Sequence, residues 1–313
     1  MKVNYEEIQY KKYGKCLRIS TSKLEAIVTL DLGPRVISFR RTAGENIFWE
    51  DLNDELFVNS KTQDQAFYKG ATWNAYGGHR VWMAPETYLT YYPDDNKVDY
   101  IVEENNFTFI QEPQKHNEIQ ITLKLNFTDE NTVKFIGGIK NLSKAEKKLS
   151  VWSLSMCKGP GLEIVKLPED EREFTPQRLY TLWSFGAKNN DPRAFYGERY
   201  FSLRMEPGNP LAYKVGMRLN PGKVMYLTGN EVFVKSFNRD DLKLYPDNNV
   251  NYETYTKDVH LELEVLSPLK ALKKDEYYHV EEIWNIYKLE EEIPLTNDED
   301  DYEYLYNKYA KKD

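Results

Sequence analysis

The sequence predicts an all-β protein of antiparallel sheets, and three observations favour this fold class. Short segments alternate apolar and polar residues, which is the pattern of strands with one buried face. These segments recur about every 8–12 residues, with Asn, Asp, Gly and Pro between them. The 24 tyrosines among 313 residues suit half-buried strand positions. A sandwich or barrel is therefore expected rather than alternating strands and helices.

The first half of the chain consists of predicted strands joined by turns. Alternation is clear in Leu24-Glu-Ala-Ile-Val-Thr-Leu30, and Asp31-Leu-Gly-Pro34 is typical of a turn. Residues 51–72 are less regular and are expected to cover one end of the sheets. The strands predicted in this half are 15–20, 24–30, 35–40, 47–49, 98–102, 108–110, 119–125, 132–136 and 149–156.

The second half begins with an irregular segment, residues 166–200, which we expect to form a functional cover over one sheet. Further strands are predicted at 200–204, 212–216, 224–227, 232–235, 260–266 and 277–287. The acidic tail, residues 290–313, is expected to be structural, either as an amphipathic helix or as a frayed end. Without repeats or a flexible linker, residues 1–313 are predicted to form a single domain.

Composition narrows the function classes. Lys and Arg number 42 against 50 Asp and Glu, and the net charge of −8 argues against a general binder of nucleic acid or anionic membranes. No secretory signal or long apolar span is recognisable, so we expect a cytoplasmic location. Cys16 and Cys157 are expected to be inert buried thiols. The four histidines lack metal-ligand spacing and no nucleotide motif occurs, so no metal or cofactor is expected.

Residues 73–96 concentrate groups that suit ring binding: two Trp, four Tyr, Gly77-Gly78 and the adjacent His79-Arg80. The two glycines permit positive φ, so the following side chains can be held at unusual angles. Polar groups beside flat aromatic faces are typical of sites for sugars and other amphipathic rings. The alternative is a glycine turn followed by a buried, satisfied strand.

Candidate acid/base groups are His79 and two glutamates on a later strand. A histidine beside a fixed cation tends to have a lowered pKa and can exchange a proton near neutrality, although a lone histidine is commonly a hydrogen-bonded core residue. Glu262 and Glu264 are two residues apart on a predicted strand, so they share a face. They are either well-positioned bases or solvated carboxylates.

Several motifs in series resemble the galactose-mutarotase-like superfamily, the β-supersandwich fold of aldose 1-epimerases, and within it a bacterial group of uncharacterised mutarotase-like proteins. The resemblance covers about residues 20–287. Its landmarks are Leu32-Gly-Pro-Arg-Val-Ile-Ser38, Gly77-Gly-His-Arg-Val-Trp82, Asn141-Leu-Ser143, Val151-Trp-Ser153, Tyr213-Lys-Val-Gly216, Phe233-Val-Lys235, Asn251-Tyr-Glu253, Leu263-Glu-Val-Leu-Ser-Pro268 and Glu282-Ile-Trp284.

The resemblance implies a carbohydrate site on the larger sheet and general acid/base chemistry. In aldose 1-epimerases a glutamate on a C-terminal strand removes the anomeric hydroxyl proton while a histidine protonates the ring oxygen. By position, Glu264 resembles that glutamate and His79 resembles the histidine near the glycine pair. This pairing requires both side chains to face one cavity. The substrate-binding residues expected with them are Arg80 and Glu86 as polar anchors, Trp82 and Trp152 as stacking walls, and Lys214 as a cation.

One departure from the family pattern bears on the reaction. The strand through Trp152 lacks the acid histidine that mutarotases carry there, so either His79 takes that role or the protein acts on a different sugar. Arg80, Lys214 and Lys235 either meet a phosphate or uronate group or are paired strand charges. The hypotheses are an aldose epimerase-like enzyme, a non-catalytic sugar-binding protein, and a uronate lyase or hydrolase-like enzyme. Each takes a small carbohydrate, with no nucleic-acid or membrane partner.

Overall fold

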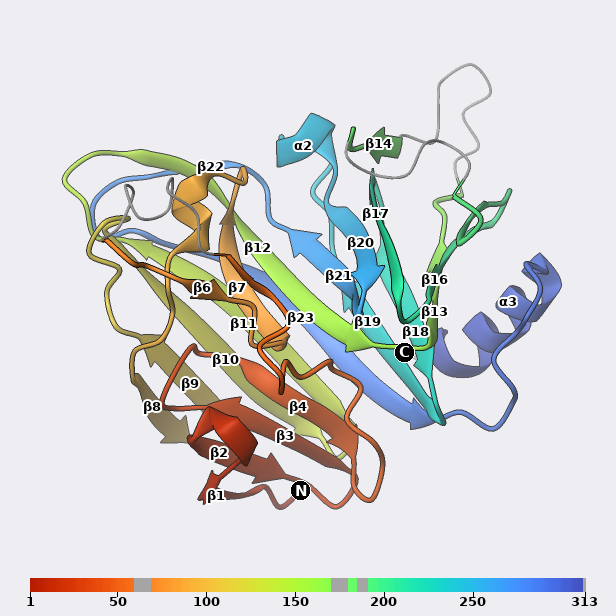
Figure 1. Cartoon of the computed structure of the whole chain (residues 1–313), viewed down its shortest axis with the longest axis horizontal. Helices are drawn as coiled ribbons and strands as arrows, with labels where there is room; N and C mark the ends of the chain where they lie inside the picture. Colours follow the sequence, from red (N-terminus) through yellow and green to blue (C-terminus); the bar gives the residue numbers. More distant parts are fainter. Residues whose placement is uncertain (59–68, 170–179, 185–190, 312–313) are drawn as a thin grey trace.

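The computed structural model describes residues 1–58, 69–169, 180–184 and 191–311, and within these ranges most of the regular secondary structure is strand. The strands form two large antiparallel sheets that pack face to face (Figure 1). This confirms the predicted all-β class. Of residues 166–200, expected to form a cover, residues 170–179 and 185–190 lie outside the described residues.

The first sheet carries the candidate site at its centre. In the described residues it contains eleven strands, which in sheet order are β1 (Asn4–Gln9), β2 (Lys15–Ser20), β3 (Leu24–Thr29), β4 (Val36–Arg41), β7 (Gly78–Ala84), β12 (Lys147–Lys158), β21 (His260–Leu266), β20 (Tyr252–Asp258), β17 (Asn209–Met217) and β14 (Tyr180–Leu182), with β22 (Lys270–Leu272) paired to β12.

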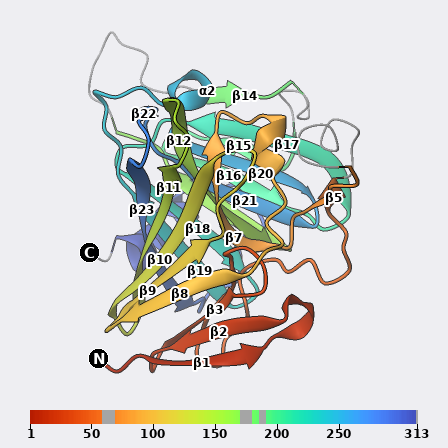
Figure 2. The ribbon, with the colours of Figure 1, turned by 90° about the vertical axis from the view of Figure 1, so that its left-hand side faces the viewer.

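The second sheet covers one face of the first, and its strands β8 to β11 lie side by side in Figure 2. Its described strands, in sheet order, are β15 (Ala194–Tyr196), β16 (Tyr200–Met205), β13 (Gly161–Lys166), β18 (Gly222–Thr228), β19 (Glu231–Phe237), β23 (Tyr277–Lys288), β11 (Thr132–Asn141), β10 (Ile119–Asp129), β9 (Asn106–Gln111) and β8 (Val98–Glu103). A small third sheet pairs β5 (Phe57–Val58) with β6 (Trp73–Asn74).

The core lies between the two large sheets because each strand turns alternate side chains inward. Along β10, buried and half-buried residues alternate strictly from Ile119 to Phe127. At the centre of the core, Phe39 of the first sheet packs edge-on against Phe233 and Trp284 of the second, with ring centroids 5.9 and 5.5 Å apart. Full burial of each such ring contributes about 1.5–3 kcal/mol.

The acidic tail forms a helix that packs on the outer face of the second sheet (Figure 1). Tyr302, Leu305 and Tyr309 are buried there against Leu227 and Val232. The described helices are η1 (Lys11–Tyr13), η2 (Tyr88–Tyr91), α2 (Pro246–Asn249), α3 (Glu299–Leu305) and η3 (Tyr306–Ala310). Among the described residues, no helix has both the length and the apolar character required to cross a bilayer.

The strands that alternation does not reveal include β1, β13 and β20. In β20, Glu253 and Thr254 are neighbours that point to opposite faces, and both are buried. A strand with buried polar groups on both faces has no period-two signal. Conversely, residues 47–49 are not a strand, and Phe48 makes only an isolated bridge to Cys157.

Candidate functional site

A cavity of about 480 Å³ lies on the face of the first sheet that points away from the second sheet. The strands β7, β12, β21, β20 and β17 are consecutive neighbours beneath it. Its lining is mainly aromatic and charged. The lining residues are Glu55, Leu56, Trp73, Ala75, Arg80, Trp82, Glu86, Tyr91, Trp152, Leu154, Met156, Lys214, Tyr255, Lys257, Asp258, His260 and Glu262.

The register between strands brings these side chains to one face. Paired residues in neighbouring strands point the same way, and residues two apart along a strand do so as well. The pairings that build the cavity floor are Trp82 with Trp152, Arg80 with Leu154, Met156 with Glu262, Glu262 with Tyr255, and Tyr255 with Lys214. All five residues expected to bind substrate, namely Arg80, Trp82, Glu86, Trp152 and Lys214, therefore line one cavity.

His79 does not share this face. It is fully buried between the sheets, 4.2 Å from the ring of Phe135 and 4.5 Å from that of Trp284. Its Nδ1 lies 2.7 Å from Ser155 Oγ and its Nε2 lies 3.0 Å from Ser153 Oγ. Burial, with the cations Lys235 and Arg80 nearby, lowers its pKa well below the usual value. His79 is a satisfied core residue, and the structure does not bring it together with Glu264 across one ligand.

Glu264 lies on the cavity face but beneath the lining residues. It is fully buried, and its Oε2 accepts hydrogen bonds from Trp152 Nε1 at 2.8 Å and Lys214 Nζ at 3.0 Å. Burial raises the pKa of Glu264 well above the usual value, against the pull of Lys214 and with the neighbouring Glu253 adding to the rise. Both of its hydrogen-bond donors line the cavity. Glu264 therefore holds two lining side chains in place and is not itself one of the lining residues.

Lys214 is the cation held by that carboxylate. Its ammonium also pairs with Glu253 at 2.7 Å and lies 4.8 Å from the ring centroids of both Trp152 and Trp183. Two carboxylates and two indole faces fix the ammonium at the cavity wall. Lys235 lies elsewhere: it is buried between the sheets, where it pairs with Glu282 at 3.1 Å.

The aromatic wall is a continuous set of rings. Trp82 packs against Trp73, Tyr91 and Trp152 with centroid distances of 5.3, 5.2 and 5.4 Å. The Tyr91 hydroxyl donates to the carboxylate of Glu86, which keeps that acid at the rim of the wall. Such a surface offers flat apolar faces with polar groups at their edges.

Arg80 is stacked inside this wall. Its guanidinium lies 3.7 Å from the ring centroid of Trp82 and 4.8 Å from that of Trp73. The side chain is buried, and Nε and Nη1 have no hydrogen-bond partner among the described residues. Burial lowers the pKa of Arg80 to about 10, so the group stays charged at neutral pH.

The polar centre of the cavity is Glu262 with His260, two residues apart on β21. His260 Nε2 lies 3.3 Å from Glu262 Oε1. Burial alone would raise the pKa of Glu262, but the hydrogen bond from His260 and the nearby cations outweigh it and lower that pKa. The carboxylate is therefore ionised at neutral pH and can accept a proton.

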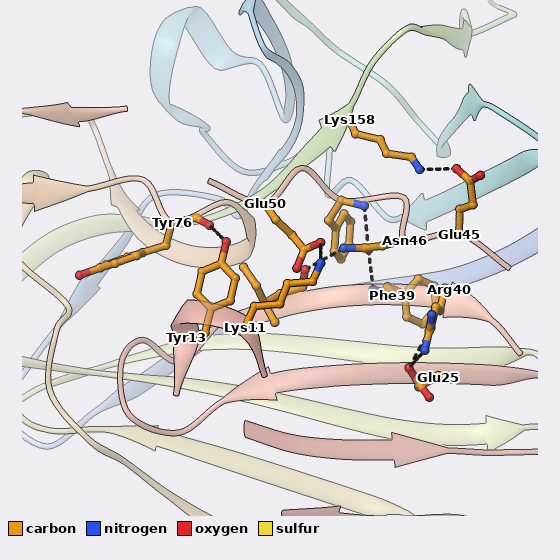
Figure 3. A network of polar contacts seen from close by, with 12 residues as sticks. Lys11, Tyr13, Glu25, Phe39, Arg40, Glu45, Asn46, Glu50, Tyr76 and Lys158 are labelled. Atoms are coloured by element: carbon orange, nitrogen blue, oxygen red, sulfur yellow. Dashed lines mark hydrogen bonds and ion pairs between the residues drawn. The ribbon is translucent and has the colours of Figure 1, made fainter. Parts of the chain in front are cut away.

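His260 is oriented by Trp49, whose ring stacks on the imidazole at 5.3 Å. The segment that leads into Trp49 is held in place by polar contacts (Figure 3). Asn46 accepts a hydrogen bond from the backbone N–H of Phe39 at 3.0 Å, and Lys158 pairs with Glu45 at 2.6 Å. The backbone N–H of Trp49 also donates to Met156 O at 2.8 Å. These contacts fix the imidazole against the cavity wall.

The glycine pair at the start of β7 has positive φ angles, which the sequence permits, 88° at Gly77 and 72° at Gly78. A Cβ on Gly77 would lie 2.2 Å from Trp49 O, and one on Gly78 would lie 2.5 Å from Val36 O. Arg35 supports the same turn by donating to Ala75 O at 2.7 Å. The turn thus lets β7 approach the segment that carries Trp49.

The sequence motifs point to Glu264 as the base, whereas the residues of β21 that line the cavity are His260 and Glu262. A usable signal was present: His260, Glu262 and Glu264 alternate along one strand and so share a face. Likewise, His79 and Arg80 are adjacent on one strand and must point to opposite faces, so they could not both reach one cavity. No group of three or more His, Cys, Asp or Glu in the described part of the chain could hold a metal ion.

Comparison with solved structures identifies the fold. A galactose mutarotase-like protein from Clostridium acetobutylicum superposes with a TM-score of 0.51 at 14% identity, covering 91% of this chain and 98% of that one. A protein assigned provisionally as an aldose 1-epimerase from Klebsiella pneumoniae superposes with a TM-score of 0.54 at 10% identity, covering 91% of this chain and 83% of that one. A protein assigned provisionally as a mutarotase from Salmonella typhimurium superposes with a TM-score of 0.54 at 8% identity, covering 88% of this chain and 90% of that one.

These likenesses confirm the fold predicted by the sequence motifs: the chain has the galactose-mutarotase-like β-sandwich architecture. No protein-family model matches the sequence, and no protein with a curated description matches it. At such low identity the comparisons establish the architecture, and the chemistry must be argued from the cavity itself.

Proposed function

We propose that this protein binds a carbohydrate in the cavity and transfers protons on it, as an aldose epimerase-like isomerase. The observation that carries the proposal is an ionised carboxylate, Glu262, held 3.3 Å from His260 in a cavity walled by Trp73, Trp82 and Trp152. Indole faces suit the apolar faces of sugar rings, and the carboxylate is a proton acceptor beside a group that can donate. The galactose-mutarotase-like fold supports a carbohydrate ligand.

The proposed step needs no cofactor. Glu262 accepts the proton of the anomeric hydroxyl as the bond between the anomeric carbon and the ring oxygen breaks, and His260 donates a proton to that ring oxygen. Both oxygens are bonded to one carbon, so the adjacent Glu262 and His260 can serve them from one side. Rotation in the open aldehyde, followed by the reverse transfers, gives the other anomer.

The test is anomer exchange measured by NMR with neutral aldoses, uronates and sugar phosphates. The Glu262→Gln variant should lose at least about 100-fold in exchange rate, since general acid–base groups contribute about 10²–10⁴-fold. The matched control is Glu281→Gln, which changes an exposed glutamate on β23 and should keep the wild-type rate. Exchange by Glu262→Gln at the wild-type rate would exclude Glu262 as the base.

A non-catalytic sugar-binding protein is the second candidate, and the placement of His79 favours it. The expected acid histidine is buried between the sheets, and His260 is the one histidine among the lining residues of the described chain. Binding of a sugar without exchange in any member of the panel would select this candidate. Release of an unsaturated product from a uronate, seen as new ultraviolet absorbance, would instead indicate a lyase.

A further inference from the structure

Arg80 differs from the other buried arginines of the described chain. Arg35, Arg193 and Arg239 each pair with an aspartate, at 2.8, 2.7 and 2.7 Å respectively. Arg80 is 3% exposed, forms no ion pair with a described carboxylate, and leaves Nε and Nη1 without a hydrogen-bond partner. Removing an unpaired charge from water is strongly unfavourable, so buried arginines are normally paired.

The contacts of Arg80 hold its side chain in place but provide no hydrogen-bond acceptor for Nε or Nη1. The faces of Trp82 and Trp73 stabilise the cation, but they accept no hydrogen bonds from the edge of the guanidinium. The guanidinium is thereby fixed in one place on the cavity lining. A guanidinium held in this way without a counter-charge favours a carboxylate or phosphate group in the cavity.

We infer that the ligand of this cavity is an acid sugar, whose carboxylate or phosphate group accepts hydrogen bonds from Arg80. This inference rests on the proposed carbohydrate function and names the class of sugar. The strands that carry Arg80 and Glu262, β7 and β21, flank β12 and so lie about 10 Å apart. A ligand that reaches both residues has its acidic group at one end and its reacting carbon at the other.

The acidic side chains that line the cavity restrict where the acidic group of the ligand can bind. Glu262 is ionised, and Glu86, Glu55 and Asp258 also line the wall. An acidic group placed beside them would be repelled, whereas beside Arg80 it replaces the missing counter-charge. The remaining lining cations are Lys257 and Lys214, and Lys214 is already paired with two carboxylates.

Calorimetric titration with matched sugars tests the inference. The probes are glucose, glucuronate and glucose 6-phosphate, and galactose, galacturonate and galactose 6-phosphate. The wild type should bind at least one acid sugar about tenfold or more tightly than its neutral parent, as expected for a charge-assisted contact. The Arg80→Gln variant should lose this preference, so that its affinities for the acid sugar and for the neutral parent become similar. The matched control, Arg18→Met at an exposed pair on β2, should keep the preference.

The outcomes separate this inference from the proposed function. Neutral and acid sugars bound equally by the wild type, or a preference that survives in Arg80→Gln, would overturn the role of Arg80 and leave carbohydrate binding standing. Binding of no sugar from either series would overturn the proposed function itself. If Arg80→Gln does not fold, the Arg80→Lys variant and the salt dependence of wild-type binding provide the test. Added salt should weaken binding of the acid sugar and leave binding of its neutral parent unchanged. Whether the uronate or the 6-phosphate binds more tightly identifies the acidic group.

Discussion

At the residue scale, the site depends on which neighbours on a strand face the cavity. His79 and Arg80 are adjacent on β7, yet one is satisfied by two serines in the core and the other is unpaired in the cavity wall. Glu264 and Glu262 share a face, yet one is buried beneath Trp152 and the other lines the cavity. We therefore propose His260 and Glu262, in place of His79 and Glu264, as the pair that exchanges protons with a ligand.

A core role for His79 predicts a loss of stability without a loss of ligand affinity. The His79→Ala variant leaves a cavity against Phe135 and removes the partner of the hydroxyls of Ser153 and Ser155. We expect the free energy of unfolding to fall by about 2–4 kcal/mol in urea titrations at pH 7.5. Sugar affinity, measured where the variant is folded, should stay unchanged. A selective loss of affinity at full stability would contradict this assignment.

The same variant should change the acid sensitivity of the fold. The pKa of His79 is lowered in the folded state, so the unfolded chain takes up the proton first as pH falls through 6.5. Stability contributed by neutral His79 is thus present above that pH and is lost below it. The difference in unfolding free energy between wild type and His79→Ala should shrink from pH 7.5 to pH 5. A constant difference would show that His79 does not titrate on unfolding.

At the element scale, the turn before β7 determines whether the site forms. Gly77 has a φ of 88°, and an added Cβ would lie 2.2 Å from Trp49 O, in the segment that orients His260. Gly208 has a φ of 80°, but an added Cβ there would meet nothing within 4 Å. The two glycines therefore separate the effect of a left-handed backbone from that of a collision.

Alanine substitutions at these two glycines give a matched comparison. Gly208→Ala should lower the free energy of unfolding by about 1–2 kcal/mol, the cost of the left-handed conformation for a residue with a Cβ. Gly77→Ala should lower it by about 3 kcal/mol or more, because the backbone around Trp49 must also move. Urea unfolding followed by tryptophan fluorescence measures both. Equal losses would mean that the contact with Trp49 is relieved without strain.

The C-terminal helix offers a second comparison within one element. Tyr302 is fully buried and donates to Asn297 Oδ1 at 2.9 Å, whereas Tyr304 is 56% exposed. Tyr302→Ala should lower the free energy of unfolding by about 3 kcal/mol or more, and Tyr304→Ala by less than about 1 kcal/mol. Thermal or urea unfolding provides the measurement. Similar small losses in both variants would show that the tail is not part of the cooperative fold.

At the scale of the whole molecule, the architecture could be predicted and the site only in part. Alternation located strands such as β10, where one face is buried, but it missed β20, where polar residues are buried on both faces. The five residues predicted to bind substrate line one cavity. They could be selected from the sequence because they are aromatic or charged residues of the kinds that bind sugars. One face of β7 lines the cavity, and the other packs against Phe135 and Trp284 from distant strands. The spacing of residues in the sequence does not show which face packs in this way.

The packing of the two sheets also buries one carboxyl group that should make stability depend on pH. Glu163 of β13 is fully buried, accepting hydrogen bonds from Tyr252 at 2.5 Å and Thr254 at 2.7 Å, with Lys235 also nearby. Burial raises its pKa from 4.5 to about 8 despite these contacts. The folded state therefore holds a proton that the unfolded chain releases above about pH 4.5.

The raised pKa of Glu163 should make the fold less stable as pH rises. Between about pH 4.5 and 8 the folded state binds more protons than the unfolded state, so this carboxyl group lowers the free energy of unfolding as pH rises, by about 3–5 kcal/mol in all. Glu163→Gln removes the titration, so its stability relative to the wild type should increase steadily from pH 5 to pH 9 in urea unfolding. Glu6→Gln, at an exposed ion pair, should show no such trend. Parallel wild-type and Glu163→Gln profiles would mean that Glu163 is ionised in the folded core, with its charge balanced by Lys235.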